Sequence, residues 1–459
     1  MMRNPPATED GLVRRLLRRL GPEPLPVMAP APRPMQAAHT PRDVRPVQAQ
    51  PGASAPVRPA QAEAFTPTQP KRGRRFMTGR HNELSRILQA LWEEQAHVVL
   101  YTDRGRGKTS LANLVVELLR QGSVIVARHT CESGSTFDSI MRGLVRDLPH
   151  ALLAVPGSGN LSGCEEALPQ GELRPRDIVG LPSRLTCRRL VCVIDEFDRV
   201  EDAGTRTRLA DTIKQLSDAA VPMAFLVVGV SENLEAILGQ HPSIQRNLVA
   251  VPLPFLSDAE IVRLIEHGME EAGFTVEPGV TGQVTGVARG SPYMAQLAGL
   301  RLVQAAKRRG ATSVIAADFD NAVLQLLDEA PLPVLGAYAG LTGSGTDAKL
   351  IRAVHALAAL EQDVWGRIAV LPSFRDGVMA GTELIGPDTW EHLLQTGFVR
   401  PAPGHAYRHT FADRGLMHHV LLLSSLSAGA PAGTAQPSLV PSGPQAAVGG
   451  WGGRPAMHP

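Results

Sequence analysis

The chain has 459 residues, which is long enough for two or three domains with well-buried cores. Its 46 basic and 44 acidic residues give a net charge of +2, so no field of the whole molecule marks it as a binder of nucleic acid or of membrane surfaces. Residues 1–75 depart from this balance, because 13 basic and 5 acidic side chains give them +8 and leave −6 for the other 384 residues. Any attraction to a polyanion is therefore expected to begin at this N-terminal arm.

The cysteines indicate a reducing compartment. They show neither the paired close spacing of a zinc site nor the framework of a secreted disulfide protein: Cys131, Cys164, Cys187 and Cys192. No run of about 20 uncharged apolar residues occurs, so neither a transmembrane segment nor a cleaved export signal is expected. A cytoplasmic location fits these features best.

Both ends of the chain have the composition of disordered segments. Residues 12–20 alternate leucines with pairs of arginines at helical spacing, which predicts a short basic amphipathic helix. It is either a disordered end or a docking helix for a partner or an anionic surface. Residues 21–70 hold 13 of the 38 prolines, so residues 1–75 are predicted to be a disordered arm. Residues 427–459 are likewise predicted to be a disordered tail.

Residues 76–256 alternate between helical patterns and short apolar runs. Helices are predicted at residues 83–95, 110–121 and 136–148, and strands at residues 97–101, 123–128, 190–194, 224–230 and 249–253. Apolar runs without polar alternation suit strands buried on both faces, and their spacing suits βαβ crossovers. The prediction is a doubly wound α/β domain, a parallel sheet with helices on both faces. A cluster of Gly, Pro and Ser at residues 155–182 is expected to be a long surface insertion.

Downstream the strand patterns stop. Four helices are predicted at residues 257–273, 279–288, 291–309 and 316–329, and they form a small helical domain over residues 257–330. The first opens with Ser257 and Glu260, the spacing of a capping box. After a break rich in Gly and Pro at residues 331–345, the pattern predicts helices at residues 347–361 and 383–394 and a hairpin at residues 397–409.

Residues 346–426 are therefore either a winged helix or a small helical domain. Two arginines flanking the hairpin turn would suit phosphate contacts, but the segment lacks a one-sided basic face. On the second interpretation its histidines are surface or capping residues: His405, His409, His418 and His419.

A phosphate-binding loop is predicted between the strand at residues 97–101 and the helix that follows it. The loop consists of Thr102, Asp103, Arg104, Gly105, Arg106, Gly107, Lys108 and Thr109, with Ser110 opening the helix. Glycines let backbone N–H groups turn toward an anion at a helix N-terminus, a lysine reaches the β and γ phosphates, and a hydroxyl binds magnesium. Thr102 departs from the usual glycine, and its Cβ is tolerable only if φ stays negative.

A second motif strengthens the first. The apolar strand at residues 190–194 ends in Asp195 and Glu196. An acid at the carboxyl end of a strand beside the phosphate loop can hold magnesium, and the next acid can orient an attacking water. Thr109 and Asp195 are therefore the predicted magnesium ligands, and Glu196 is the predicted catalytic base.

Together the two motifs and the helical domain after the sheet resemble an AAA+ P-loop ATPase. The resemblance covers residues 76–329 and is greatest to the branch shared by origin-recognition-like initiators, transposition-helper ATPases and related bacterial ATP-binding proteins. It implies ATP and Mg²⁺ as cofactors and a helical lid domain. It also implies that residues 76–84, with Gly79 and Arg80, pack near the adenine.

The resemblance implies further site residues. Ser231 and Asn233, after the strand at residues 224–230, are both candidates for the sensor of the γ-phosphate. Arg246 matches an arginine near the subunit boundary that could act on a neighbour's nucleotide. Residues 290–293, Gly-Ser-Pro-Tyr, match the turn before the second sensor helix, but residues 294–300 lack the expected basic residue, and only Arg289 lies nearby.

Three functions remain open from the sequence. The first is an ATPase that couples ATP binding and hydrolysis to domain movement and to assembly with itself or with an unknown protein partner. The second is an ATP-dependent initiator or mobile-element helper that contacts DNA through its C-terminal domain and basic arm. The third is a scaffold that binds ATP and hydrolyses it little.

Overall fold

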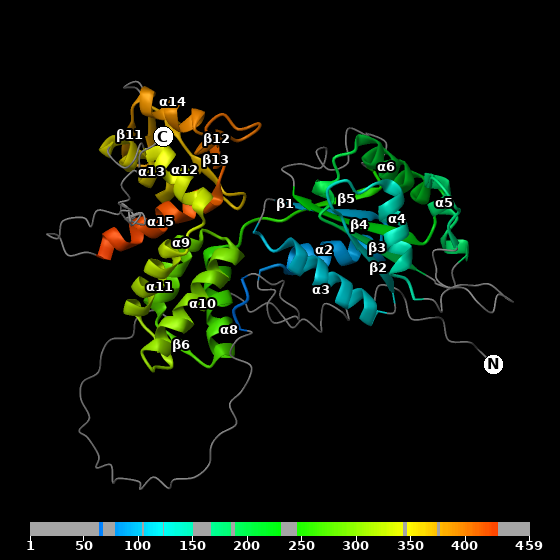
Figure 1. The fold of residues 1–459 in the computed structure, drawn as a ribbon, viewed down its shortest axis with the longest axis horizontal. Coiled ribbons are helices and arrows are strands. Elements are labelled where there is room, and N and C mark those ends of the chain that lie inside the picture. Colours follow the sequence, from blue (N-terminus) through cyan, green and yellow to red (C-terminus); the bar gives the residue numbers. More distant parts are fainter. Residues whose placement is uncertain are drawn as a thin grey trace, which may run out of the picture.

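The protein is described by a computed structural model that covers residues 64–67, 79–102, 105–122, 124–149, 167–184, 189–230, 246–342, 347–373 and 377–429. Most of the N-terminal arm, including the amphipathic stretch at residues 12–20, and residues 430–459 of the tail lie outside these ranges. A sheet domain, a helical domain and a C-terminal domain follow one another along the chain (Figure 1). None of the described helices combines the length and apolar character needed to cross a membrane.

A five-stranded parallel sheet forms the centre of the first domain. Its strands occur in the spatial order β2-β3-β4-β1-β5, and every neighbouring pair is parallel. Their bounds are β1 (His97–Thr102), β2 (Ile125–Thr130), β3 (Leu190–Asp195), β4 (Met223–Val230) and β5 (Leu248–Pro252). Every residue of β3 is buried, which explains its uninterrupted apolar run. The predicted parallel sheet is confirmed.

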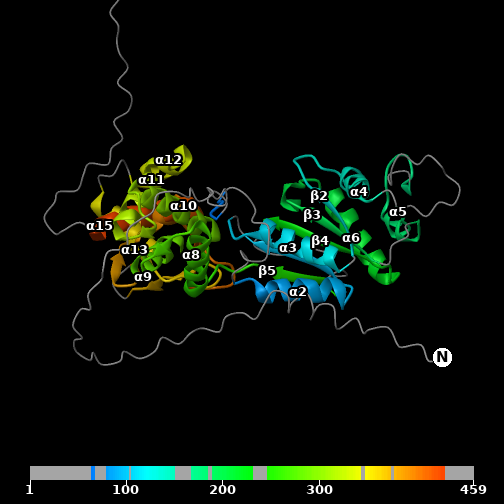
Figure 2. The same cartoon turned by 90° about the horizontal axis from the view of Figure 1, so that it is seen from below.

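Helices cover both faces of the sheet (Figures 1 and 2). α2 (His81–Trp92) and α3 (Lys108–Gln121) pack on one face, and α4 (Phe137–Arg146) and α6 (Ala203–Asp218) pack on the other. Successive residues of β3 enter opposite cores: Val191 and Val193 lie with α2 and α3, whereas Cys192 lies with α4 and α6. This alternation is the pleat of a strand buried on both sides.

The stretch expected to be a surface insertion is partly built into the sheet domain. Within its described part, residues 167–184, the short helix α5 (Pro175–Val179) packs against α6, and three leucines and an isoleucine are buried in the core beside α4: Leu168, Leu173, Ile178 and Leu181. The expectation is wrong here because isolated apolar residues among Gly, Pro and Ser give no periodic signal.

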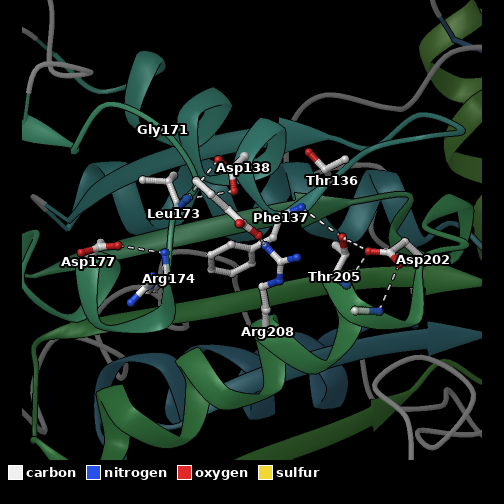
Figure 3. Close-up of polar contacts among 12 residues, drawn as sticks. Thr136, Phe137, Asp138, Gly171, Leu173, Arg174, Asp177, Asp202, Thr205 and Arg208 are labelled. Atoms are coloured by element: carbon white, nitrogen blue, oxygen red, sulfur yellow. Dashed lines mark hydrogen bonds and ion pairs between the residues drawn. The ribbon is translucent and has the colours of Figure 1, made fainter.

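Polar contacts fix this segment and the start of α6 (Figure 3). The carboxylate of Asp138 on α4 accepts the backbone N–H of Leu173 at 3.0 Å. Asp202 caps α6 by accepting the N–H of Thr205 at 2.7 Å, and the Thr205 hydroxyl accepts the N–H of Phe137 at 3.1 Å. α4 is thereby tied to both of its neighbours.

The helical domain matches the prediction closely. Its helices are α8 (Asp258–Ala272), α9 (Pro278–Ala288), α10 (Pro292–Arg308) and α11 (Ala316–Asp328). The capping box of Ser257 and Glu260 is present at the start of α8. A short parallel pair, β6 (Thr275–Val276) and β7 (Ser313–Val314), was not predicted, because two residues carry no periodicity.

The C-terminal domain departs more from the sequence interpretation. Its elements are α12 (Leu332–Thr342), α13 (Ala348–Ala359), β8 (Arg367–Ala369), β9 (Leu371–Pro372), β10 (Val378–Ala380), β11 (Glu383–Ile385), α14 (Pro387–Gln395), β12 (Val399–Pro401), β13 (Arg408–Phe411) and α15 (Arg414–Gly429). α12 replaces the break expected at residues 331–345, because Pro331 and Pro333 fall at the start of the helix, where proline is tolerated. The helix expected at residues 383–394 begins only at Pro387, since β11 precedes it.

The predicted hairpin is confirmed, but the prediction for the histidines is wrong in part. β12 and β13 are antiparallel, with Arg400 opposite Thr410. His418 is 5 % exposed and His419 is 7 % exposed, so neither is a surface residue. His418 donates from Nε2 to the carbonyl of Ala288 at 3.1 Å, and burial lowers its pKa to about 3. Both histidines lie in the stretch of α15, residues 416–422, that is buried.

α15 belongs to two cores at once. Leu416 and Val420 pack with α13 and the small strands, whereas Leu422 packs in the core of the helical domain. Its last described residue, Gly429, extends the helix past the boundary expected at residue 427. The C-terminal domain therefore shares a helix with the domain before it.

Candidate nucleotide-binding site

The loop between β1 and α3 has the backbone of an anion-binding turn. Gly105 has φ +80° and Gly107 has φ +89°, the left-handed region that favours glycine. No atom lies within 4 Å of the position that a Cβ on Gly107 would take, so the backbone conformation, rather than space, requires this glycine. Gly107 is also the N-cap of α3, so the helix begins at Lys108 and its free N–H groups face the loop.

Thr102 is accommodated as a strand residue. It is the last residue of β1, it is not among the residues with positive φ, and its hydroxyl donates to the carbonyl of Leu253 at 2.8 Å. The departure from glycine therefore costs no backbone strain. The ammonium of Lys108 donates to the Thr102 carbonyl at 3.2 Å, so it lies over the loop.

Two buried arginines hold the loop from behind. Arg106 is 5 % exposed, and its guanidinium donates to the carbonyls of Leu253 at 3.1 Å and Trp365 at 3.3 Å. Arg80 donates to the carbonyl of Arg106 at 3.2 Å and pairs with Glu83 at 3.6 Å. Burial lowers the pKa of Arg80 to about 10, and the Glu83 carboxylate opposes this shift. Gly79 and Arg80 thus lie behind the loop, and their packing near the adenine stays a prediction.

Asp195 lies at the carboxyl end of β3 and is 3 % exposed. Its Oδ1 accepts the N–H of Glu196 at 2.9 Å, and its Oδ2 accepts from Nη2 of Arg128 at 2.5 Å. Arg128 also donates to the side-chain oxygen of Asn113 on α3. The predicted magnesium ligand is therefore paired with a cation of this chain, which the sequence interpretation did not foresee.

Glu196 is held in an unusual conformation. Its φ is +53°, which is left-handed and uncommon for a residue with a Cβ, and the strain is of the order of 1–3 kcal/mol. Its side chain is exposed and accepts from Nη1 of Arg199 at 2.9 Å.

A neighbouring cysteine feels the charge of these acids. Burial raises the pKa of Cys131 to about 12, and the carboxylates of Asp195, Asp198 and Glu196 add to this shift. The acids thus create a negative field at this edge of the sheet.

The phosphate loop and the acids open on the same edge of the sheet. β1 and β3 both run parallel to β4, with Thr102 beside Val230 and Ile194 beside Val227. β4 separates the two strands. The sequence interpretation had assumed that they were direct neighbours, and this assumption is wrong. Asp195 follows Ile194, so two strand spacings, about 10 Å, and an offset of two residues along β4, about 7 Å, separate it from Thr102. The side chains, a metal ion and a triphosphate together can span distances of this size.

The residues at this edge fit a magnesium ion. The hydroxyl of Thr109 and the carboxylate of Asp195 supply oxygen donors, which Mg²⁺ prefers, and Mg²⁺ commonly takes its other ligands from phosphates and water. No described group of three or more His, Cys, Asp and Glu is arranged to hold a metal by itself, so such an ion would depend on the nucleotide.

Several predicted residues are not brought into the site or lie outside the described residues. Asp103 and Arg104 of the loop, and Ser231 and Asn233 after β4, are outside the described ranges; β4 nevertheless lies between β1 and β3, so its carboxyl end faces the same edge. Arg246 is exposed and precedes β5, whose Leu248 pairs with His97 at the start of β1. Arg246 is therefore at the edge of the sheet opposite to its own phosphate loop.

The turn at residues 290–293 does face the loop. A Cβ on Gly105 would lie 3.8 Å from the Cβ of Tyr293. Gly290, with φ +73°, packs so closely on the segment between β5 and α8 that its own Cβ would lie 2.5 Å from the Leu256 carbonyl. The nearby Arg289 does not point its hydrogen bond at the loop: it donates to the carbonyl of Ala359 at 2.9 Å and so contacts the C-terminal domain.

An aromatic residue that the sequence interpretation missed connects the loop to the C-terminal domain. Phe255, between β5 and α8, lies between two guanidinium groups, with Arg106 and Arg414 each 3.8 Å from its ring centre. Its backbone N–H donates to the carbonyl of Val364 at 2.8 Å. Gly366 is required here, because a Cβ would lie 1.7 Å from Nη2 of Arg414. The one sign of this contact in the local sequence was Arg106, a long side chain between Gly105 and Gly107 of the loop.

One family model and several solved structures match this chain. The family model of the AAA domain matches residues 91–238. A comparison with curated proteins found no match. The chain is similar to the Walker-type ATPase of Pyrococcus abyssi, with 17% identity over 77% of this chain and 98% of that one and a TM-score of 0.46.

Two further solved structures show a similar likeness. The ORC2 protein of Aeropyrum pernix has 16% identity over 76% of this chain and 96% of its own, with a TM-score of 0.43. The RuvB Holliday junction branch migration motor of Thermotoga maritima has 15% identity over 74% and 94%, with a TM-score of 0.42.

The matched region contains the phosphate loop and both acids. Residues 91–238 run from the end of α2 past β4 and include the loop after β1 and both acids after β3. Within this region two glycines with positive φ precede the N-terminus of α3, the geometry of an anion-binding turn, and the strand before them belongs to a parallel sheet. The family model of the AAA domain thus matches the part of the chain, residues 91–238, that holds the phosphate loop and both acids.

Proposed function

We propose that this chain is a magnesium-dependent ATPase in which ATP binding and hydrolysis move the helical and C-terminal domains relative to the sheet. In this proposal Lys108 and the loop N–H groups hold the phosphates, and Thr109 and Asp195 hold the magnesium ion, which neutralises charge on the phosphates. Glu196 orients the attacking water, and Ser231 or Asn233 contacts the γ-phosphate.

The observation that carries the proposal is the edge that the loop shares with Asp195 and Glu196. Strained backbone persists where the surrounding structure enforces it, and it gathers at functional sites. Glu196 has such a backbone directly after the buried Asp195, and its carboxylate remains exposed. This arrangement suits a base that must reach a water molecule beyond the strand end.

The contacts of Arg106 support coupling between the nucleotide and the C-terminal domain. A change in the loop on phosphate binding would be felt at Phe255 and Trp365, because Arg106 touches both. Phe255 is also the connection between the sheet and α8, so the same residue senses a movement of the helical domain. A two-state response needs such differential contacts in each state.

Replacing Glu196 tests the enzymatic role. We expect Glu196→Gln to keep ATP binding and to lower turnover by about 10²-fold or more, the range of a lost general base. Glu201→Gln, which changes an exposed acid nearby, should leave turnover unchanged. Lys108→Ala should abolish nucleotide binding. Unchanged turnover in Glu196→Gln would remove this residue from its assigned role.

One observation favours the alternative of a scaffold that hydrolyses little. Both acids are paired with arginines of the same chain, Asp195 with Arg128 and Glu196 with Arg199. If these pairs persist with ATP bound, the acids are withdrawn from catalysis. In that case wild-type turnover would already be as low as that of Glu196→Gln, while binding of ATP would remain tight.

The initiator or mobile-element helper is a second candidate, supported by the C-terminal fold. β12 and β13 follow α14 and form an antiparallel sheet with the earlier strand β8, and this sheet packs with α13 and α15, an arrangement similar to a winged helix. The exposed Arg400 lies on β12, but α14 carries Asp388 and Glu391, which disfavour contact with phosphates. Retention on duplex DNA that falls steeply with salt would support DNA binding, and no retention at low salt would exclude it.

A further inference from the structure

A short piece of the N-terminal arm is packed into the helical domain. Residues 64–67 lie against α8 and α10, where the blue segment meets the helical domain in Figure 1. Ala64 is 1 % exposed and Phe65 is 4 % exposed, so both belong to the core of that domain. The composition of residues 21–70 predicted a disordered linker, and this prediction is wrong for these four residues.

The groove that receives Phe65 is made by two glycines. A Cβ on Gly268 of α8 would lie 2.4 Å from the Phe65 ring, and a Cβ on Gly299 of α10 would lie 2.3 Å from it. Glycine is unfavourable inside a helix by roughly 0.5–1 kcal/mol relative to alanine, so two glycines facing one ring indicate that space for the ring has been kept.

A polar contact fixes the register of the segment in the groove. The backbone N–H of Thr66 donates to Oε1 of Gln296 at 3.2 Å. Gln296 lies three residues before Gly299, so it projects from the same face of α10. The groove therefore recognises an aromatic side chain followed by a backbone N–H group, which is how a helical domain would hold a peptide.

The same helix contacts the chain again where it reaches the phosphate loop. Gly79 packs so closely on α8 that its Cβ would lie 2.3 Å from the Glu260 carboxylate, and the next residue, Arg80, donates to the Arg106 carbonyl. Glu260 and Gly268 are eight residues apart on α8, or about 12 Å. The chain thus contacts α8 at both points, at Phe65 of the arm and at Gly79 where the sheet domain begins.

We propose that the groove between α8 and α10 is a peptide-docking site of the helical domain and that its occupant is the Phe65 segment of the same chain. The helical domain thereby fixes the point at which the basic arm leaves the folded protein. Phe65 supplies the apolar anchor, and Gln296 accepts a hydrogen bond from the backbone of the segment. The further consequence, that nucleotide-driven movement of this domain carries the arm with it, rests on the proposed function.

Emptying the groove tests the docking site. Full-length Phe65→Ala should bind a fluorescent peptide of residues 60–70 at least about tenfold more tightly than the wild type, whose groove is already filled. Adding Gly268→Ala and Gly299→Ala to Phe65→Ala should abolish that binding, because two methyl groups then fill the groove and alanine favours the helix. Leu324→Ala, which removes an exposed apolar side chain from α11, should bind the peptide as weakly as the wild type.

Hydrogen exchange provides a readout that is independent of peptide affinity. Exchange in α8 and α10 should rise in Phe65→Ala and stay at the wild-type level in Phe65→Leu, which keeps an apolar anchor. Equal exchange in wild type and Phe65→Ala would overturn the proposal, as would equal peptide binding by the two proteins. Loss of an oligomer in Phe65→Ala, measured by sedimentation, would assign the groove to the arm of a second copy and overturn the cis assignment.

The test also separates the docking site from the proposed ATPase. All of its readouts are measured without nucleotide, so a protein that fails to hydrolyse ATP can still show the docking, and an active ATPase can still lack it.

Discussion

Truncating Arg414 should weaken nucleotide binding although this residue does not touch the phosphate loop. Its guanidinium lies 3.8 Å from the Phe255 ring centre and donates to Oε1 of Gln362 at 2.8 Å and to the Gly366 carbonyl at 3.3 Å. Only the cation–π contact with Phe255 crosses to the segment after β5, and the two hydrogen bonds hold the guanidinium in place within the C-terminal domain; at about 1 kcal/mol each, these three contacts amount to roughly 3 kcal/mol.

The loop feels only part of this loss. Arg106 shares the Phe255 ring and donates to the Trp365 carbonyl, and these two contacts restrain the loop by roughly 2 kcal/mol. If undocking of the C-terminal domain releases half of that restraint or all of it, the affinity for ATP falls by about 5- to 30-fold. The affinity falls because a freer loop must be ordered again when the phosphates bind.

Titration of a fluorescent ATP analogue into Arg414→Ala measures this coupling. Arg352→Ala is the matched control, because Arg352 is an exposed arginine of the same domain, 65% exposed and 3.9 Å from Glu383, and its loss should leave the affinity unchanged. Hydrogen exchange at residues 362–366 reports whether the domain has undocked. Increased exchange there with an unchanged dissociation constant would refute the idea that the C-terminal domain acts on the loop.

Two further predictions concern the ion pair of Asp195 and two buried histidines. Arg128→Gln should lower the magnesium concentration needed for half-maximal binding of an ATP analogue by about tenfold, because the guanidinium no longer competes for Asp195; an unchanged midpoint would mean that the two do not compete. Burial holds the pKa of His97 at about 4 and that of His418 at about 3, below the ordinary value of 6.5. The unfolded histidines take up protons below pH 6.5 while the folded ones do not, so the free energy of unfolding should fall as the pH drops from 6.5 toward 4, by up to about 1.4 kcal/mol per pH unit for each histidine. Denaturant titrations should show a shallower pH slope for His418→Gln, and an equal slope would contradict its role.

The sheet could be predicted from the sequence because its physical cause is local. A strand buried on both faces needs apolar residues at every position, and β3 shows this along its whole length. The helical domain was equally legible, since its helices are long and capped, as at Ser257. In contrast, β6 and β7 have two residues each, and the helix α12 begins among prolines, so neither has a periodic signal.

The candidate site divides in the same way. The loop glycines, Lys108 and Asp195 belong to contiguous motifs, and their residue types alone indicate their chemistry. The contact between Phe255 and Arg414 joins residues far apart in the chain, and the Arg128 pair joins two strands. Such contacts depend on the arrangement of elements in space, which no local pattern records.

Phe65 shows the limit of composition as evidence. The average composition of residues 21–70 is that of a segment that cannot bury enough apolar surface to fold by itself. An average does not describe what a single residue in the segment does. A single aromatic side chain needs no periodicity and no neighbours when a folded domain supplies the groove. One residue in such a segment can therefore be anchored by glycines more than 200 positions away, such as Gly268 and Gly299.

The position of Arg246 bears on how the proposed ATPase would be completed. Arg246 precedes β5 at the edge where β1 begins, whereas the phosphate loop follows the other end of β1. Six strand residues separate these edges by roughly 20 Å, which is beyond the reach of an arginine side chain. If Arg246 stabilises the transition state, the nucleotide must therefore belong to another copy of the chain. Arg246→Ala should then lower turnover in assembled protein alone, and mixing it with Lys108→Ala protein should restore activity, since each copy supplies what the other lacks. An equal loss of activity in dilute monomer would show that the arginine acts within its own subunit or through the fold.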